Sequence, residues 1–205
     1  MAKIDLKKEM KQLYTAGKEP AIVTVPEMTF VAYDGQGDPN TSKEYQDSMG
    51  VIFGLAYTIK FMCKEMDTSK VVDFVVMPLE GLWWTDDMSD FSVANKENWK
   101  WTVMIALPDY IDIEIFNEAK KRLFAKKEQS NIGKARLEKY EDGLSAQILH
   151  LGPYAEEPPT IEKLHRFIKE QGYRMHKKHR EIYFNSPQRV APEKLKTIIR
   201  QPITK

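Results

Sequence analysis

The stretch His179-Arg-Glu-Ile-Tyr-Phe184 gives the clearest indication of how this chain folds. Successive side chains of an extended strand point to opposite faces, so Ile182 and Phe184 share one face. Glu181 and Tyr183 share the other face. The sequence therefore predicts a strand whose apolar face belongs to a core and whose other face presents a carboxylate beside a phenol.

The four tryptophans occur as two close pairs elsewhere in the chain. Trp83 and Trp84 are adjacent, so on an extended strand at most one of them lines a given cleft wall and the other belongs to the core. Trp99 and Trp101 share a face, and both ligand contact and packing against helices stay open for them. Together with Glu181, these rings indicate an aromatic pocket that contains an acid.

The composition is that of a globular protein whose charges produce no overall electrostatic field. The chain has 205 residues, of which 42% are hydrophobic and 11% aromatic, enough for one large domain or two small modules. Thirty-one Lys and Arg balance thirty Asp and Glu, giving a formal charge of +1. Nothing in this balance draws the protein to nucleic acid or to a membrane, so any binding specificity must be local.

The cysteine content and the N-terminus favour a soluble cytoplasmic protein. Cys63 is the only cysteine, which excludes an internal disulfide framework and a Cys-pair zinc site. The first residues are charged where a secretory signal needs an apolar run, and no stretch approaches the roughly 20 apolar residues of a membrane span.

Turn signals and hydrophobic periodicity divide the chain into two similar series of elements. A short amphipathic helix is expected at residues 5–14. The first series then comprises a strand at 21–33, a helix from Thr41 or Ser42 to Met66, strands at 71–77, 79–84 and 99–107, and an acidic loop at 85–96.

The second series repeats this order. It comprises a hairpin at 135–151 that turns at Glu141-Asp-Gly143, a helix that contains residues 161–168 and ends at Gly172, and strands at 177–184 and 195–200. We therefore expect a single α+β domain over residues 1–205, built from tandem duplicated strand-helix-strand-strand modules at 21–107 and 132–205. A linking segment at 108–131, with a helix at 114–127, joins them, and a central cleft is expected between the modules.

Several motifs in the same order resemble the GyrI-like small-molecule-binding proteins, and in particular their stand-alone bacterial branch, which carries the double Trp. The similarity extends from about Leu6 to the end of the chain. The motifs are Asp34-Gly-Gln-Gly-Asp-Pro-Asn40, Met77-Pro-Leu-Glu-Gly-Leu-Trp-Trp84, His150-Leu-Gly-Pro-Tyr154 with Glu157, His179-Arg-Glu-Ile-Tyr183 and Pro192-Glu-Lys-Leu-Lys-Thr-Ile-Ile-Arg200.

The resemblance implies the tandem fold and a ligand. Related drug-binding domains of MerR-type and AraC-type multidrug-responsive activators hold lipophilic aromatic cations in an aromatic cleft against a central glutamate, which corresponds to Glu181 here. Some stand-alone relatives are hydrolases that open the strained cyclopropane of DNA-alkylating natural products. No helix-turn-helix segment is recognisable in this chain, so no direct DNA binding is expected.

The expected ligand is a lipophilic aromatic or cationic small molecule. A partly desolvated carboxylate at Glu181 is costly unless a cation or hydrogen bonds offset it, and the ligand can be that cation. The alternative is that Glu181 lies at the surface and forms an ion pair with Lys177 or Arg180. Glu181 and Tyr183 are the candidate ligand-binding residues and, for a hydrolase, the catalytic ones. The other candidate ligand contacts are Tyr154, Trp84, Trp83, Trp101, Trp99, His150 and Glu157.

Glu157 also has a purely structural explanation, because a helix N-terminus favours an acid. Three candidate metal ligands lie close together in the sequence: His176, His179 and Glu181. On one strand, however, His176 faces away from the other two. Only two ligands then remain, whereas a catalytic zinc usually has three protein ligands. No metal and no cofactor is therefore expected, and no nucleotide or serine-nucleophile motif is present. A module that blocks a partner enzyme such as a topoisomerase follows only from the family name.

Overall fold

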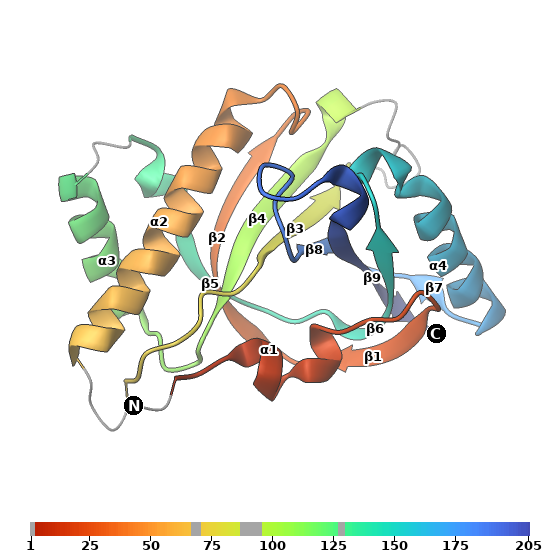
Figure 1. Ribbon diagram of the computed structural model, residues 1–205, viewed down its shortest axis with the longest axis horizontal. Coiled ribbons are helices and arrows are strands. Elements are labelled where there is room, and N and C mark those ends of the chain that lie inside the picture. The colour runs from red at the N-terminus through yellow and green to blue at the C-terminus, as the bar shows by residue number, and fades with distance from the viewer. Residues whose placement is uncertain (1–2, 67–70, 87–95, 127–129) are drawn as a thin grey trace. The chain divides into compact units, whose positions relative to one another are not determined.

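The computed structural model describes residues 3–66, 71–86, 96–126 and 130–205 (Figure 1). They form two compact α+β units. The first unit contains Met1–Glu9, Met28–Met77 and Trp83–Tyr140, and the second contains Met10–Glu27, Pro78–Leu82 and Glu141–Lys205. The predicted α+β class is confirmed, whereas most of the acidic loop expected at residues 85–96 lies outside the described residues.

The first unit combines an antiparallel sheet with two helices. Its central strand β2 (Met28–Gln36) pairs with β4 (Lys100–Leu107) on one side and with β5 (Arg136–Tyr140) on the other. The helices α2 (Lys43–Met66) and α3 (Ile113–Lys126) pack against each other, and α2 also packs on β2 and β4. Its smaller elements are α1 (Leu6–Glu9), η3 (Lys96–Asn98) and η4 (Ser130–Lys134).

Helix α2 begins and ends where its sequence predicts. Ser42 caps it, because the Ser42 Oγ accepts a hydrogen bond of 3.2 Å from the backbone N–H of Tyr45. Its buried stripe recurs at helical spacing and includes Cys63, which is fully buried, as expected for a core cysteine. The other stripe residues are Val51, Ile52, Leu55, Ala56, Ile59 and Met62.

The second unit is a sheet with one helix on its face. The strand order is β1 (Ala21–Val25), β6 (Gly143–Leu151), β9 (Lys196–Thr204) and β8 (His179–Tyr183), each antiparallel to the next, and β7 (Arg174–Met175) pairs with the end of β9. The first residues of β3 (Leu79–Trp84) also belong to this unit.

Helix α4 (Pro158–Glu170) covers one face of this second sheet (Figure 1). It begins with proline, which suits the first helical turn, and Gly172, with φ +73°, follows its end as predicted. The core under it consists of Ala146, Ile148, Leu164, Ile168, Ile199 and Ile203. The remaining short elements are η1 (Lys11–Leu13), η5 (Tyr154–Glu156) and η6 (Pro192–Lys194).

The hairpin expected at residues 135–151 is wrong in its pairing. Both strands exist, and Gly143 has the positive φ of a turn glycine, at +73°. However, β5 pairs with β2, while the nine residues of β6 pair with β1 and β9. Strand pairing on both sides satisfies more backbone groups of β6 than a single hairpin partner would, which explains the outcome.

Three other expected elements differ from the structure. The strand at 71–77 is reduced to one parallel bridge between Phe74 and Ile4, and Lys60 Nζ donates a hydrogen bond of 2.6 Å to the carbonyl of Phe74. The helix at 5–14 is split into α1 and η1. The extended stretch at 21–33 is two strands, separated at Pro26, which has no N–H to donate to a ladder. None of the helices in the described ranges is long and apolar enough to cross a membrane.

Candidate functional site

Strand β8 alternates as the sequence predicts, and it places a carboxylate between two donors. Glu181 Oε1 lies 3.2 Å from Nε2 of His179, and Tyr183 donates a hydrogen bond of 2.5 Å from its phenol to Glu181 Oε2. All three side chains therefore share one face of the strand. The Glu181 side chain is 13% exposed, so the carboxylate is largely, but not fully, withdrawn from water.

The opposite face of β8 is fully buried. Ile182 belongs to the core, and Arg180 Nη1 forms an ion pair of 2.8 Å with Glu80 Oε2. Lys177 donates to the backbone carbonyls of residues 141 and 142. Lys177 and Arg180, the cations considered as surface partners of Glu181, are thus bound to other groups.

Tyr154 completes the cluster around Glu181. Its ring meets the ring of Tyr183 edge to face, with centroids 5.4 Å apart. Burial, and then the negative charges of Glu157 and Glu181, raise the pKa of Tyr154 to about 12. The phenol is therefore a hydrogen-bond donor at neutral pH, and its side chain is open to solvent at the edge of the cluster.

His150 and Glu157 are buried residues that stabilise the segment carrying Tyr154. The two ring nitrogens of His150 lie 2.9 Å from Thr160 Oγ1 and 3.1 Å from the carbonyl of Pro153, which holds the chain that enters α4. His150 is 4% exposed and Glu157, at the residue before α4, is 5% exposed. This structural role suffices to explain His150, whereas Glu157 also acts on the Tyr154 phenol.

Two histidines of the site were not among the expected site residues. His179 is buried beside Glu181, and burial together with the charge of His179 lowers the pKa of His165 on α4. Strand alternation alone places His179 with Glu181, so this signal was present in the sequence. Among the described residues, no group of three or more His, Cys, Asp or Glu side chains is arranged to hold a metal ion.

The tryptophans belong to the first unit, where most of them pack in its core. Tyr45 of α2 contacts the rings of Trp83 and Trp101, at 5.9 and 5.0 Å between centroids, and Trp83 lies 5.6 Å from Trp99. Trp83, Trp99 and Trp101 are buried, as packing against helices requires. Trp84 is only partly buried, so of this pair it is Trp83 that joins the core.

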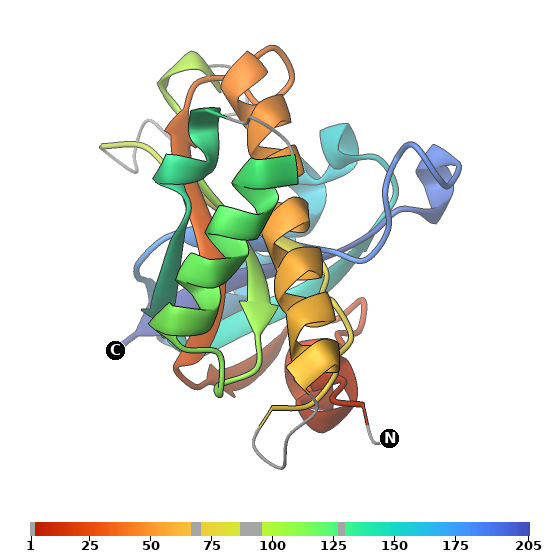
Figure 2. The same ribbon diagram turned by 90° about the vertical axis from the view of Figure 1, so that its left-hand side faces the viewer.

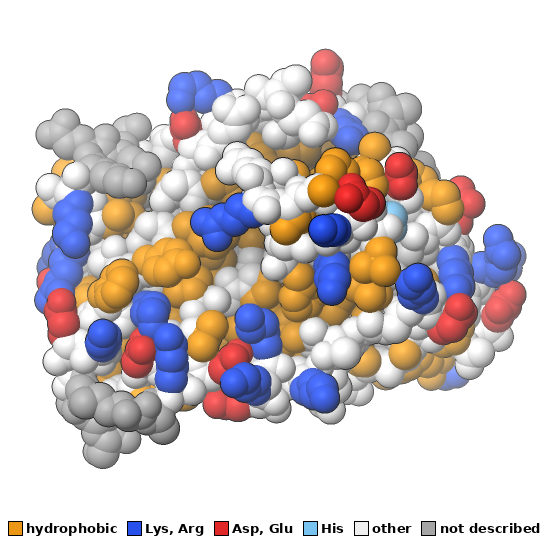
Figure 3. Space-filling view, viewed as in Figure 1, with side chains coloured by type: hydrophobic (Ala, Val, Ile, Leu, Met, Phe, Trp, Pro, Cys, Tyr) orange, Lys and Arg blue, Asp and Glu red, His pale blue; other side chains and the backbone are white. Residues whose placement is uncertain are grey.

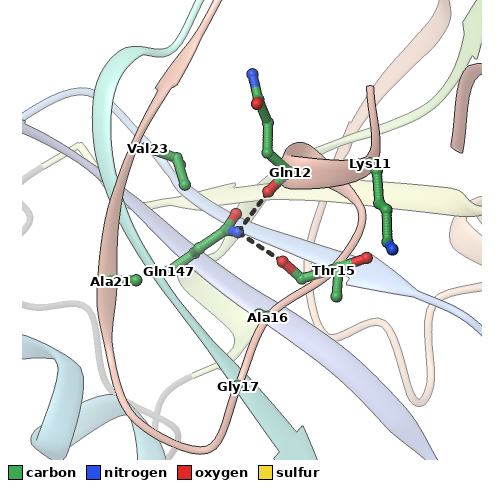
Figure 4. A pocket seen from close by; sticks show the side chains of 8 residues that line it. All are labelled: Lys11, Gln12, Thr15, Ala16, Gly17, Ala21, Val23 and Gln147. Carbon is green, nitrogen blue, oxygen red and sulfur yellow. Dashed lines mark hydrogen bonds between the residues drawn. The ribbon is translucent and has the colours of Figure 1, made fainter. Parts of the chain in front are cut away.

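A shallow hollow elsewhere in the second unit does not include Glu181 (Figure 4). It has a volume of about 500 Å³ and is lined by Lys11, Gln12, Thr15, Ala16, Gly17, Ala21, Val23 and Gln147. The Gln147 amide donates to the carbonyls of Gln12 and Thr15, at 3.0 and 3.1 Å. These bonds use the donor group of the Gln147 amide to attach the N-terminal segment.

Comparison with known proteins identifies the class. Residues 18–204 match the GyrI-like small molecule binding domain, and the chain belongs to this family. A small molecule is therefore the ligand class of the domain. A comparison with curated proteins finds no match.

Solved structures from Listeria innocua are similar over almost the whole chain. An uncharacterized conserved protein is 38% identical with a TM-score of 0.91, and covers 98% of this chain and 100% of its own. A hydrolase is 36% identical with a TM-score of 0.86 and the same coverage. The C-terminal domain of EcmrR shares the fold, with 13% identity, a TM-score of 0.58, and 91% and 98% of the two chains covered.

Proposed function

We propose that this domain binds a lipophilic aromatic, often cationic, small molecule at Glu181, Tyr183 and Tyr154. One observation carries the proposal. Glu181 is largely withdrawn from water, accepts a hydrogen bond from the Tyr183 phenol and lies 3.2 Å from Nε2 of His179. A carboxylate in this setting is costly and is stabilised by a positive ligand.

The two phenols suit the rest of such a ligand. The ring planes of Tyr183 and Tyr154 are inclined by 70°. A cation against an aromatic face gains about 0.5 to 2 kcal/mol, depending on how far it is desolvated. Trp83, Trp99 and Trp101 are proposed to act only by shaping the core.

The proposal is tested by fluorescence titration with a rhodamine or ethidium cation. Glu181→Gln should weaken binding about tenfold or more, because it removes the charge while keeping the shape. Glu170→Gln, an exposed acid at the end of α4, is the matched control and should bind as the wild type does. Equal affinity of wild type and Glu181→Gln would remove Glu181 from the site.

A second function at the same residues is hydrolysis of a strained electrophilic ring. It is favoured by the hydrolase relative, which is 36% identical over 98% of this chain. In this reaction Glu181 takes a proton from a water molecule, and the water oxygen bonds to a cyclopropane carbon. The ring C–C bond breaks and its electron pair moves to a conjugated carbonyl oxygen. The protonated Tyr154 phenol then hydrogen-bonds to that oxygen.

Incubation with a cyclopropane-bearing alkylator in ¹⁸O-labelled water, followed by mass spectrometry, separates the two functions. Many turnovers with label in the ring-opened product identify an enzyme. In that case Glu181→Gln should lower the rate by about 10² to 10⁴, as is typical for loss of a general base. Protection at one ligand per protein without ring-opened product identifies a binding protein only.

A further inference from the structure

The helices α2 and α3 carry several large apolar side chains that are exposed to solvent. Half of the ten large hydrophobic side chains that are exposed in the described part of the chain lie on these two helices. They are Tyr57, Phe61, Met66, Ile113 and Phe124. Figure 3 shows hydrophobic side chains between Lys and Arg side chains over α2.

Tyr57 and Phe61 lie at the edge of a groove between the two helices, which run side by side (Figure 2). The groove has a volume of about 210 Å³ and is lined by Tyr57, Thr58, Phe61, Met62 and Glu65 from α2 and by Arg122 and Lys126 from α3. The Tyr57 and Phe61 rings stack with centroids 6.5 Å apart and planes inclined by 28°. They are 48% and 54% exposed, so together they form an aromatic surface that is open to solvent.

The charges at this groove balance. Arg122 Nη1 lies 3.0 Å from Glu65 Oε2 across the groove, and Arg122 Nε lies 3.0 Å from Glu118 Oε1. With Lys126, the face therefore carries two acids and two bases. A face of one sign would repel its own copy, whereas this one does not.

We propose that the α2–α3 groove binds a second copy of this chain in a twofold symmetric contact. A twofold contact is made by the same patch on both copies, so the patch must contain both members of each complementary pair. This groove does: α2 supplies aromatic faces and Glu65, while α3 supplies Arg122 and Lys126. In the dimer, the cations of one copy lie over the aromatic rings of the other.

Sedimentation velocity of the full chain over a range of concentrations tests the proposal. The wild type should show a reversible monomer–dimer equilibrium. Phe61→Glu should raise the dimer dissociation constant at least about tenfold, because it puts a charge at the centre of the contact. Met175→Glu is the matched control: Met175 is also 54% exposed but lies on β7, so its dimer should equal that of the wild type.

Exchanging the charges of Glu65 and Arg122 distinguishes this specific contact from nonspecific association. Glu65→Arg and Arg122→Glu should each weaken the dimer by leaving the face with an excess of one sign, and the double variant, which again has two acids and two bases, should restore it. A wild type that stays monomeric at every concentration overturns the proposal and leaves the groove to a different protein. An equal loss of dimer affinity in Phe61→Glu and Met175→Glu overturns the proposal as well.

Discussion

Arg180 and Glu80 form an ion pair of 2.8 Å inside the second unit, with side chains only 1% and 0% exposed. Arg180 Nε also lies 3.0 Å from Asp142 Oδ2. The Tyr14 phenol donates to the other oxygen of Glu80 at 3.0 Å, and burial, followed by the Glu80 charge, raises the pKa of Tyr14 well above its usual value. The network therefore joins β8 and β3 to the segment that precedes β1.

Arg180→Met should destabilise the protein strongly. Glu80 would remain buried without its cation, and breaking a buried pair typically costs about 3 to 5 kcal/mol. Urea unfolding measures the loss. Lys43→Met is the control, because Lys43 pairs with Asp47 at the surface of α2, where a pair contributes about 0 to 1 kcal/mol. Equal losses in the two variants would contradict the structural role assigned to the buried pair.

Gly35→Ala should destabilise the first unit by about 1 to 3 kcal/mol, the usual range for overpacking. A Cβ at position 35 would lie 2.2 Å from Cη2 of Trp101, which is itself fully buried against Tyr33 and Tyr45. Tryptophan fluorescence and thermal unfolding report the change. Gly133→Ala has open space around its Cβ and should stay within about 0.5 kcal/mol of the wild type.

His165 should titrate below its ordinary pKa of 6.5, because burial and then the charge of His179 disfavour its imidazolium. The folded protein thus binds the proton less readily than the unfolded chain. This group's contribution to stability is present above pH 6.5 and is lost as pH falls through the lowered pKa. Proton NMR of the imidazole signals follows the titration, and His179→Gln should move the pKa of His165 upward. A pKa of 6.5 or above in the wild type would refute the assignment.

Tyr154 should stay protonated where an ordinary tyrosine, with a pKa of 10, ionises, since its own pKa is about 12. Phenolate absorbance of the wild type and of Tyr154→Phe should coincide up to about pH 11 and diverge above it. Because the folded pKa is the higher one, this tyrosine's contribution to stability is lost as pH rises from 10 towards 12. Glu157→Gln should lower the pKa of Tyr154. Divergence of the wild-type and Tyr154→Phe curves already near pH 10 would contradict the raised pKa.

Local patterns predicted much of this structure. Strand alternation placed Glu181 and Tyr183 on one face, and the hydrogen bond between their side chains agrees with it. The period of α2 and its cap at Ser42 were also correct, since both depend on neighbours within one or two turns. Such features are determined by residues close in sequence.

Features that depend on distant partners were not predicted. The pairing of β5 with β2 requires knowledge of the whole sheet, and the turn at Gly143 is compatible with either arrangement. Likewise, Trp101 is buried because Tyr45 and Gly35 come from elsewhere in the chain, and no local pattern distinguishes a core indole from a pocket indole. The burial of Glu80 also depends on a partner far away in the sequence, Arg180.

The attachment of the N-terminal segment has a practical consequence for anyone who shortens this protein. The family match begins at residue 18, yet Arg200 donates to the carbonyl of Leu13, and Gln147 donates to those of Gln12 and Thr15. A recombinant chain trimmed to the family boundary would remove one acceptor of the buried Arg200 guanidinium and both carbonyl acceptors of the Gln147 amide. Truncations intended for ligand-binding assays should therefore start upstream of residue 10, where the second unit itself starts.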